Sequence, residues 1–113
     1  MKQQNIFRGA LLAAVMVAPF AAQAEDPLDL AKASGCLACH SVEKKVVGPA
    51  WKDVSAKYKG DAGARDRLIA KVKAGGKGNW TAVTGGVPMP PYSPRVSDEN
   101  IGKLVDFVLG LAK

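Results

Sequence analysis

The stretch Gly35-Cys36-Leu37-Ala38-Cys39-His40 decides how this chain can fold. It holds both cysteines and the one histidine of the 113-residue sequence. The C-x-x-C-H pattern is the attachment motif for c-type haem. Its two thiols add to the two vinyl groups at one edge of the porphyrin, and the next residue is held close to the iron. We therefore predict one haem c, attached through Cys36 and Cys39 and ligated by His40.

Three other uses of these cysteines are alternatives. A thioredoxin-type redox pair belongs to an α/β fold, and no segment of this sequence alternates convincingly as a strand. A zinc site needs four ligands, and the chain has no further cysteine or histidine. A disulfide between Cys36 and Cys39 would close a very short loop and constrain little. Haem attachment is the prediction that the motif favours most.

The second axial ligand is predicted from the few donors that remain. Met1 and Met16 lie in an N-terminal segment that we expect to be removed, which leaves Met89 in Val87-Pro88-Met89-Pro90-Pro91. Proline restricts φ, so this loop would hold the thioether in one place. Methionine is more often a core residue, but a methionine paired with histidine is a known haem ligation that raises the potential. We predict His40 and Met89 as the metal ligands.

This ligation separates the candidate functions. An iron with both axial positions filled disfavours oxygen binding and peroxide chemistry, so we predict an electron-transfer protein and not an enzyme. The alternative is a haem-based enzyme or gas sensor with an open iron site.

Residues 1–24 have the pattern of a secretory signal peptide. Lys2 and Arg8 supply its positive start, and Ala22-Gln23-Ala24 is a cleavage site of small residues. The apolar run between them has 13 residues, whereas a membrane span needs about 20; an uncleaved anchor is the alternative. We expect a mature domain over 25–113, located in the periplasm and not inserted in the membrane.

The charge balance argues against nucleic acid as a partner. Removal of Lys2 and Arg8 lowers the formal net charge from +6 to +4, and no Arg-rich run or basic and aromatic stripe is present. We expect instead transient contacts with redox proteins, made by a monomer.

The rest of the sequence predicts helices joined by Gly- and Pro-rich loops. Short helices are expected after Asp26, over 51–59 and over 62–74, and a longer one after Ser97. The last is the clearest because its apolar residues share one helical face: Ile101, Leu104, Val105, Val108 and Leu109. Residues 75–96 form a long loop whose large side chains predict packing against something. The fold class is therefore all-α, with about four helices around one haem.

These motifs resemble those of the small bacterial cytochromes of the c-551 class, also called c8 or c-552. The resemblance rests on residues 35–40, 47–50 and 88–91 and covers essentially the whole of 25–113. It implies a small cytochrome c fold and a periplasmic carrier that shuttles single electrons between respiratory proteins. Nitrite reductase or a terminal oxidase would be a typical acceptor.

The resemblance also implies roles for further residues. The residue matching Pro49 accepts the second imidazole N–H through its backbone carbonyl. The residue matching Trp80 hydrogen-bonds a haem propionate, and Lys71 stands where the family often has an arginine. The sequence departs from the family over 81–86, which is longer than usual, and over 92–95, where an asparagine often bonds the axial sulfur.

One haem edge is expected to be exposed, with Val47 and Val87 beside it. Complementary charge would steer an acidic partner to this edge. The lysines expected around it are Lys32, Lys44, Lys45 and Lys52.

Overall fold

The computed structural model describes residues 13–14 and 26–112. Apart from residues 13 and 14, the predicted signal peptide lies outside the described residues. Helices and loops make up residues 26–112, in which only two isolated bridges and no β-strand occur. This confirms the all-α prediction. No helix in the described ranges has the length and apolarity needed to cross a membrane.

The first helix, α1 (Pro27–Ala33), begins as the sequence predicts. The Asp26 carboxylate accepts a hydrogen bond from the Leu28 N–H at 2.8 Å, and proline at the first helical position loses no needed donor. After α1 the chain turns directly into a short 3-10 helix, η1 (Cys36–Ala38). The attachment motif therefore begins in a 3-10 turn that directly follows α1, rather than in an open loop.

Three more helices match the predicted ones closely. α2 (Trp51–Lys57) ends two residues before the expected boundary, and α3 (Ala64–Ala74) begins two residues after it. α5 (Asp98–Leu109) is capped by Ser97, whose hydroxyl accepts from the Asn100 N–H at 3.1 Å. Helix ends commonly differ by this much, because the last turn loses its hydrogen bonds gradually.

The loop after α3 contains a helix that was not predicted, α4 (Thr81–Thr84). It is a single turn, in which the Trp80 carbonyl accepts from the N–H groups of Val83 and Thr84, both at 2.9 Å. So short a helix carries no apolar periodicity, and the sequence pattern therefore gave no signal for it.

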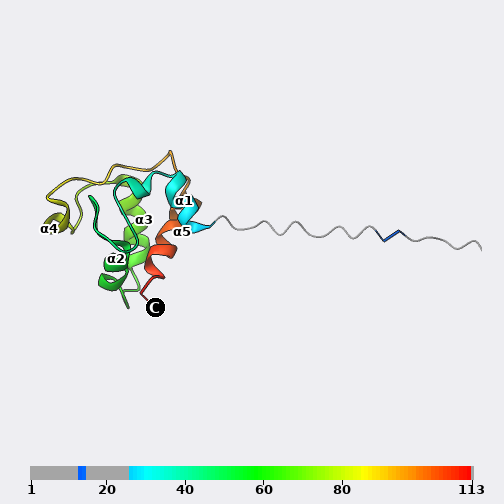
Figure 1. Ribbon diagram of the computed structural model, residues 1–113, viewed down its shortest axis with the longest axis horizontal. Helices are drawn as coiled ribbons and strands as arrows, with labels where there is room; N and C mark the ends of the chain where they lie inside the picture. The colour runs from blue at the N-terminus through cyan, green and yellow to red at the C-terminus, as the bar shows by residue number, and fades with distance from the viewer. Residues whose placement is uncertain (1–12, 15–25, 113) are drawn as a thin grey trace, which may run out of the picture.

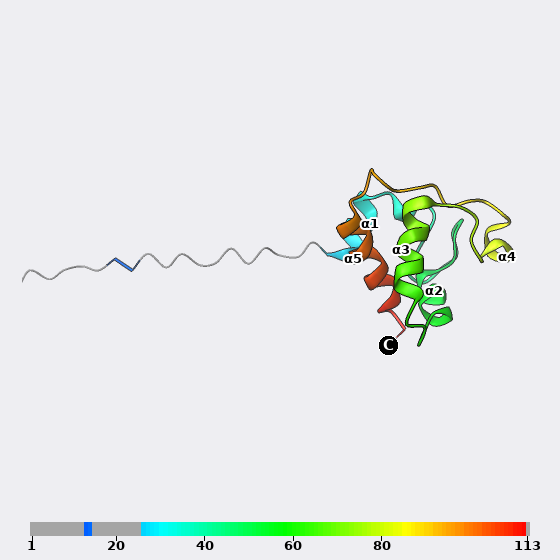
Figure 2. The same ribbon diagram turned by 180° about the vertical axis from the view of Figure 1, so that it is seen from behind.

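α5 is the centre of the domain and packs against α1, α2 and α3. Figures 1 and 2 show these helices gathered around it, with α4 on the opposite side of the domain from α1. Its apolar face serves two core clusters: Leu104 and Val108 in one, Ile101 and Val105 in the other. The second cluster also includes Tyr92 and Val96, so the loop packs against the core, as its large side chains predict.

Candidate functional site

The two cysteines lie side by side in the turn that η1 forms. The Cys36 carbonyl accepts from the N–H groups of Cys39, at 3.2 Å, and His40, at 3.0 Å. Cys36 is buried and Cys39 is half-buried, and neither thiol is in a disulfide. Burial raises the pKa of the Cys36 thiol, with smaller opposing effects from a backbone hydrogen bond and from Arg95. The structure therefore presents both sulfur atoms on one compact turn.

The imidazole of His40 is held in one orientation by two neighbours. Its Nδ1 lies 2.9 Å from the Pro49 carbonyl oxygen, and its ring stacks on that of Trp51 with centroids 5.6 Å apart and planes at 21°. A carbonyl can only accept, so Nδ1 carries the proton and Nε2 keeps its lone pair. Burial lowers the pKa of His40, and the bond to Pro49 opposes this in part. The neutral ring is the form that ligates a metal.

Gly48 allows the backbone to pass directly beside this imidazole. A Cβ atom at this position would lie 2.5 Å from Cε1 and 2.9 Å from Nδ1 of His40. The Gly48 N–H is also bonded to the Cys39 carbonyl at 2.7 Å. Sequence reasoning assigned no contact with His40 to this glycine or to Trp51. The only sequence feature that could have indicated this close approach was the glycine directly before Pro49.

Met89 is held in place by its backbone. Its N–H donates to the Gly76 carbonyl at 3.0 Å, and its carbonyl accepts from the Gly76 N–H at 2.8 Å. This two-bond bridge ties the loop to the chain just beyond α3. The approach is close, because a Cβ on Gly75 would lie 2.5 Å from the Met89 oxygen. The thioether is half-buried and packs against the second core cluster.

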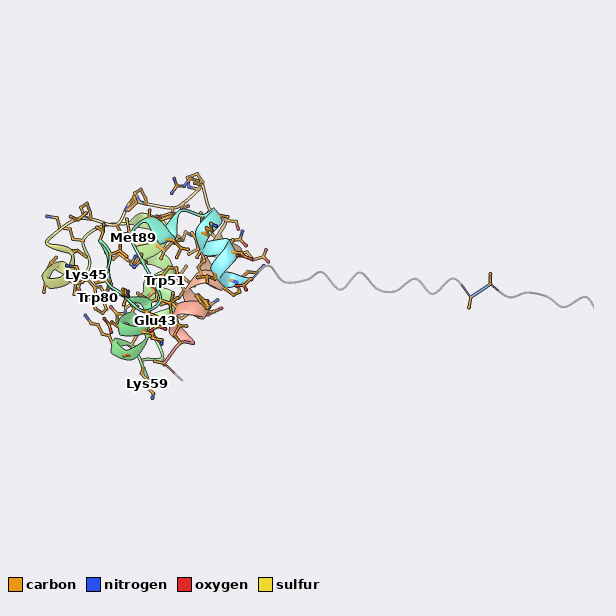
Figure 3. The ribbon with its side chains drawn as sticks, in the orientation of Figure 1. Glu43, Lys45, Trp51, Lys59, Trp80 and Met89 are labelled. Carbon is orange, nitrogen blue, oxygen red and sulfur yellow. The ribbon has the colours of Figure 1, made fainter. Side chains whose placement is uncertain are left out.

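An open, mostly apolar cavity brings these groups together, with an empty volume of about 1080 Å³ that includes its solvent-filled mouth. In Figure 3 the labelled Trp51 lies on α2, and Met89 and Trp80 lie on the loop that follows α3. Tyr92, within the stretch that departs from the family, also lines the cavity and is only 5% exposed. All six residues predicted from the sequence to form the site line it: Cys36, Cys39, His40, Pro49, Trp80 and Met89.

The rim of the cavity carries exposed apolar side chains. Val47 is 38% exposed and Val87 is 50% exposed, and both line the cavity, as predicted. Of the predicted lysines, Lys52 forms an ion pair with Glu43 at 2.6 Å, which reduces its effect as a free charge. Lys77 lines the cavity although the sequence reasoning did not select it.

These residues fit haem c. The cavity has apolar walls and an open mouth, as a flat, largely apolar ring with one exposed edge requires. Two thiols on one turn, a neutral imidazole and a thioether are the donor set that covalent attachment and axial ligation need. Within the described residues no group of three or more His, Cys, Asp and Glu side chains could hold a bare metal ion.

The comparisons with known proteins agree with this fit. The cytochrome c family model matches residues 28–112, and the chain belongs to this family. It is similar to cytochrome c-551 of Allochromatium vinosum, with 60% identity over 84 residues, covering 74% of this chain and 84% of that protein. Cytochrome c-552 of Nitrosomonas europaea is 44% identical over 103 residues, covering 91% and 93%.

A solved structure gives the same result for the fold. The crystal structure of wild-type Nitrosomonas europaea cytochrome c552 superposes with a TM-score of 0.66 at 48% identity, covering 74% of this chain and 98% of that one. The predicted family, the small all-α cytochrome c fold and the haem c cofactor are thereby confirmed. The protein is an electron carrier and not an enzyme.

Proposed function

We propose that this protein is a periplasmic monohaem carrier whose haem iron is ligated by His40 and Met89. Residues 1–24 would direct export and be removed, leaving the cytochrome domain over 25–113. Haem c supplies a one-electron couple between ferric and ferrous iron. The donors and acceptors would be respiratory redox proteins, such as nitrite reductase or a terminal oxidase.

The proposal is carried by one observation: His40 and Met89 line the same cavity, and backbone groups hold each of them in place. The Pro49 carbonyl, 2.9 Å from Nδ1, aims Nε2 away from the backbone. The bridge to Gly76 holds the Met89 backbone. Ligands held in this way need to move little when the iron changes charge. A small rearrangement favours fast electron transfer over slow chemistry at an open iron.

The Cys36 and Cys39 thiols would hold the cofactor by covalent bonds, and Trp80 would contact its propionate end. Covalent attachment would keep His40 beside the iron even when the protein fluctuates. The thioether of Met89 would stabilise ferrous iron, and the apolar walls would disfavour net charge in the same direction. A comparatively high midpoint potential is the expected result.

The test is the weak near-infrared absorption band of ferric iron bound to a thioether, measured on protein matured with haem-attachment machinery. The wild-type protein should show the band, and Met89→His should lose it and lower the midpoint potential, because imidazole is the stronger donor to ferric iron. Met89→Leu should also lose the band and should bind carbon monoxide rapidly once reduced. An unchanged potential in Met89→His, or rapid carbon monoxide binding by the wild type, would contradict the proposed ligation.

A further inference from the structure

One end of the haem cavity differs from the rest because its lining is polar. A smaller pocket adjoins the cavity there, and the two share part of their walls, including Lys71 and Trp80. Trp80 is half-buried and stands between them. The residues lining the smaller pocket are Tyr58, Arg67, Leu68, Lys71, Gly78, Asn79 and Trp80.

Lys57 reaches this end from a different helix. Its ammonium nitrogen lies 4.6 Å from the centre of a Trp80 ring and 5.8 Å from that of Tyr58. A cation at these distances is attracted to the negative face of an aromatic ring. Since Lys57 is the last residue of α2 and Trp80 directly precedes α4, the contact joins α2 to the loop that carries Met89.

The same end carries uncompensated positive charge. Arg67 is paired with Asp61, but no ion pair formed by the described residues includes Lys57 or Lys71. None of the described carboxylates lines the smaller pocket. Two free ammonium groups beside an indole therefore face a region from which anionic side chains are missing.

We infer that Lys57 is a positioning residue, which holds the Trp80 ring in place and, with Lys71, makes this end of the cavity favourable for the carboxylates of haem c. This inference rests on the proposed function, because it assigns the propionate end to Trp80. It adds the last residue of α2 to an end of the cavity that is lined by Tyr58, by α3 and by the loop beyond α3.

The inference has an electrostatic consequence. A nearby cation stabilises a carboxylate and lowers its pKa, and it disfavours the extra positive charge of ferric iron. Removal of the Lys57 charge should therefore lower the midpoint potential. It should also raise the pKa of the haem carboxylate, so that the pH-dependent fall in potential is centred at a higher pH. The other titratable and charged groups around this end remain unchanged in the test: Tyr58, Asp61, Arg67, Lys71 and Lys77.

The experiment measures midpoint potential against pH for holoprotein carrying Lys57→Gln, Lys57→Arg or the control Lys59→Gln. Lys59 loses the same charge only two residues away, and Figure 3 shows it at the end of the domain, well apart from Trp80. We expect Lys57→Gln to lower the potential and move the titration to higher pH. Lys57→Arg, which keeps charge and ring contact, should behave as the wild type, and Lys59→Gln nearly so.

Equal profiles for Lys57→Gln and Lys59→Gln would overturn the inference. A purely structural role would be revealed if Lys57→Gln lowered the thermal unfolding midpoint and left the potential–pH profile unchanged, and this also contradicts it. The near-infrared band, recorded on each variant, separates the two proposals. If the band is present throughout, an unchanged profile contradicts the role of Lys57 alone; if the wild type lacks the band, the Met89 ligation fails.

Discussion

At the scale of single residues, the attachment motif needs neighbours that do not belong to it. Nδ1 of His40 lies against the Pro49 carbonyl, which leaves Nε2 for the proposed bond to iron, and the ring lies against both Trp51 and the backbone of Gly48. Each of these contacts removes a way for the imidazole to rotate. The ligand is thus oriented before the iron arrives, which limits the cost of ordering it.

Gly48→Ala tests this orientation. The added methyl carbon would lie 2.5 Å from Cε1 of His40, so the ring must move and its bond to Pro49 must weaken. We expect a lower yield of haem-loaded protein and a visible spectrum altered from that of the wild type. The control is Gly63→Ala, where the new carbon comes close only to the flexible end of Arg67 and reaches the Asp61 carboxylate at an ordinary contact distance of 3.7 Å. Wild-type spectra and yields for Gly48→Ala would show that this close approach does not matter.

At the scale of helices and loops, the domain depends on ties between elements that are distant in sequence. Ser55 on α2 is 1% exposed. Its hydroxyl donates to the Leu109 carbonyl at 3.0 Å and accepts from the Ala112 N–H at 2.8 Å. One side chain thus closes the C-terminal end of α5 against α2, the helix that also carries Trp51 and Lys57. The residues that position the site are held by this connection.

Ser55→Ala should destabilise the domain by about 1–3 kcal/mol, because it leaves a carbonyl and an N–H without partners in a part-buried place. The measurement is denaturant unfolding of the holoprotein, with haem absorbance as one probe and helix circular dichroism as another. Ser34→Ala, at the end of α1, is the matched control, because no hydrogen bond among the described residues involves the hydroxyl of this serine. A loss below about 0.5 kcal/mol for Ser55→Ala, a change typical of surface substitutions, would contradict the role of the tie.

At the scale of the whole molecule, charge and shape suggest how partners approach. The rim of the cavity exposes Val47 and Val87, and Lys45 lies two residues before Val47 in the chain. An apolar contact with a lysine near it in the chain suits a short-lived encounter with an acidic protein, in which opposite charge steers and a small area limits affinity. Single-electron exchange requires release as well as docking.

Steering predicts a salt-dependent rate. Oxidation of the reduced protein by hexacyanoferrate(III), an anion, should slow as ionic strength rises, because salt screens the attraction. Lys45→Glu should reduce this rate by a factor of at least about two at low salt. Lys59→Glu changes the net charge equally, but Lys59 does not line the cavity and lies apart from Lys45 and Met89 in Figure 3, so its effect should be smaller. Equal effects of Lys45→Glu and Lys59→Glu on the oxidation rate, or a rate that does not change with ionic strength, would contradict electrostatic steering at this rim.

Local chemistry explains why so much of the site could be predicted. Cys36, Cys39 and His40 are adjacent in the chain, and their spacing expresses the geometry of attachment to a porphyrin edge. Met89 was predicted as the second iron ligand by elimination, because the expected mature chain has few other side chains that could bind haem iron. The helices after Asp26 and Ser97 carry their own capping residues, whose hydrogen bonds need no tertiary partner.

The sequence by itself thus determined the helical class, the cofactor and the set of candidate ligands. Only the tertiary structure decided which distant segments meet: Gly76 with Met89, Ser55 with Leu109, and Lys57 with Trp80. α4, the stacking of Trp51 on His40 and the close approach of Gly48 also appear only in the fold. The physical reason is that capping and motif spacing act within a few residues, whereas these contacts depend on how whole helices pack around α5.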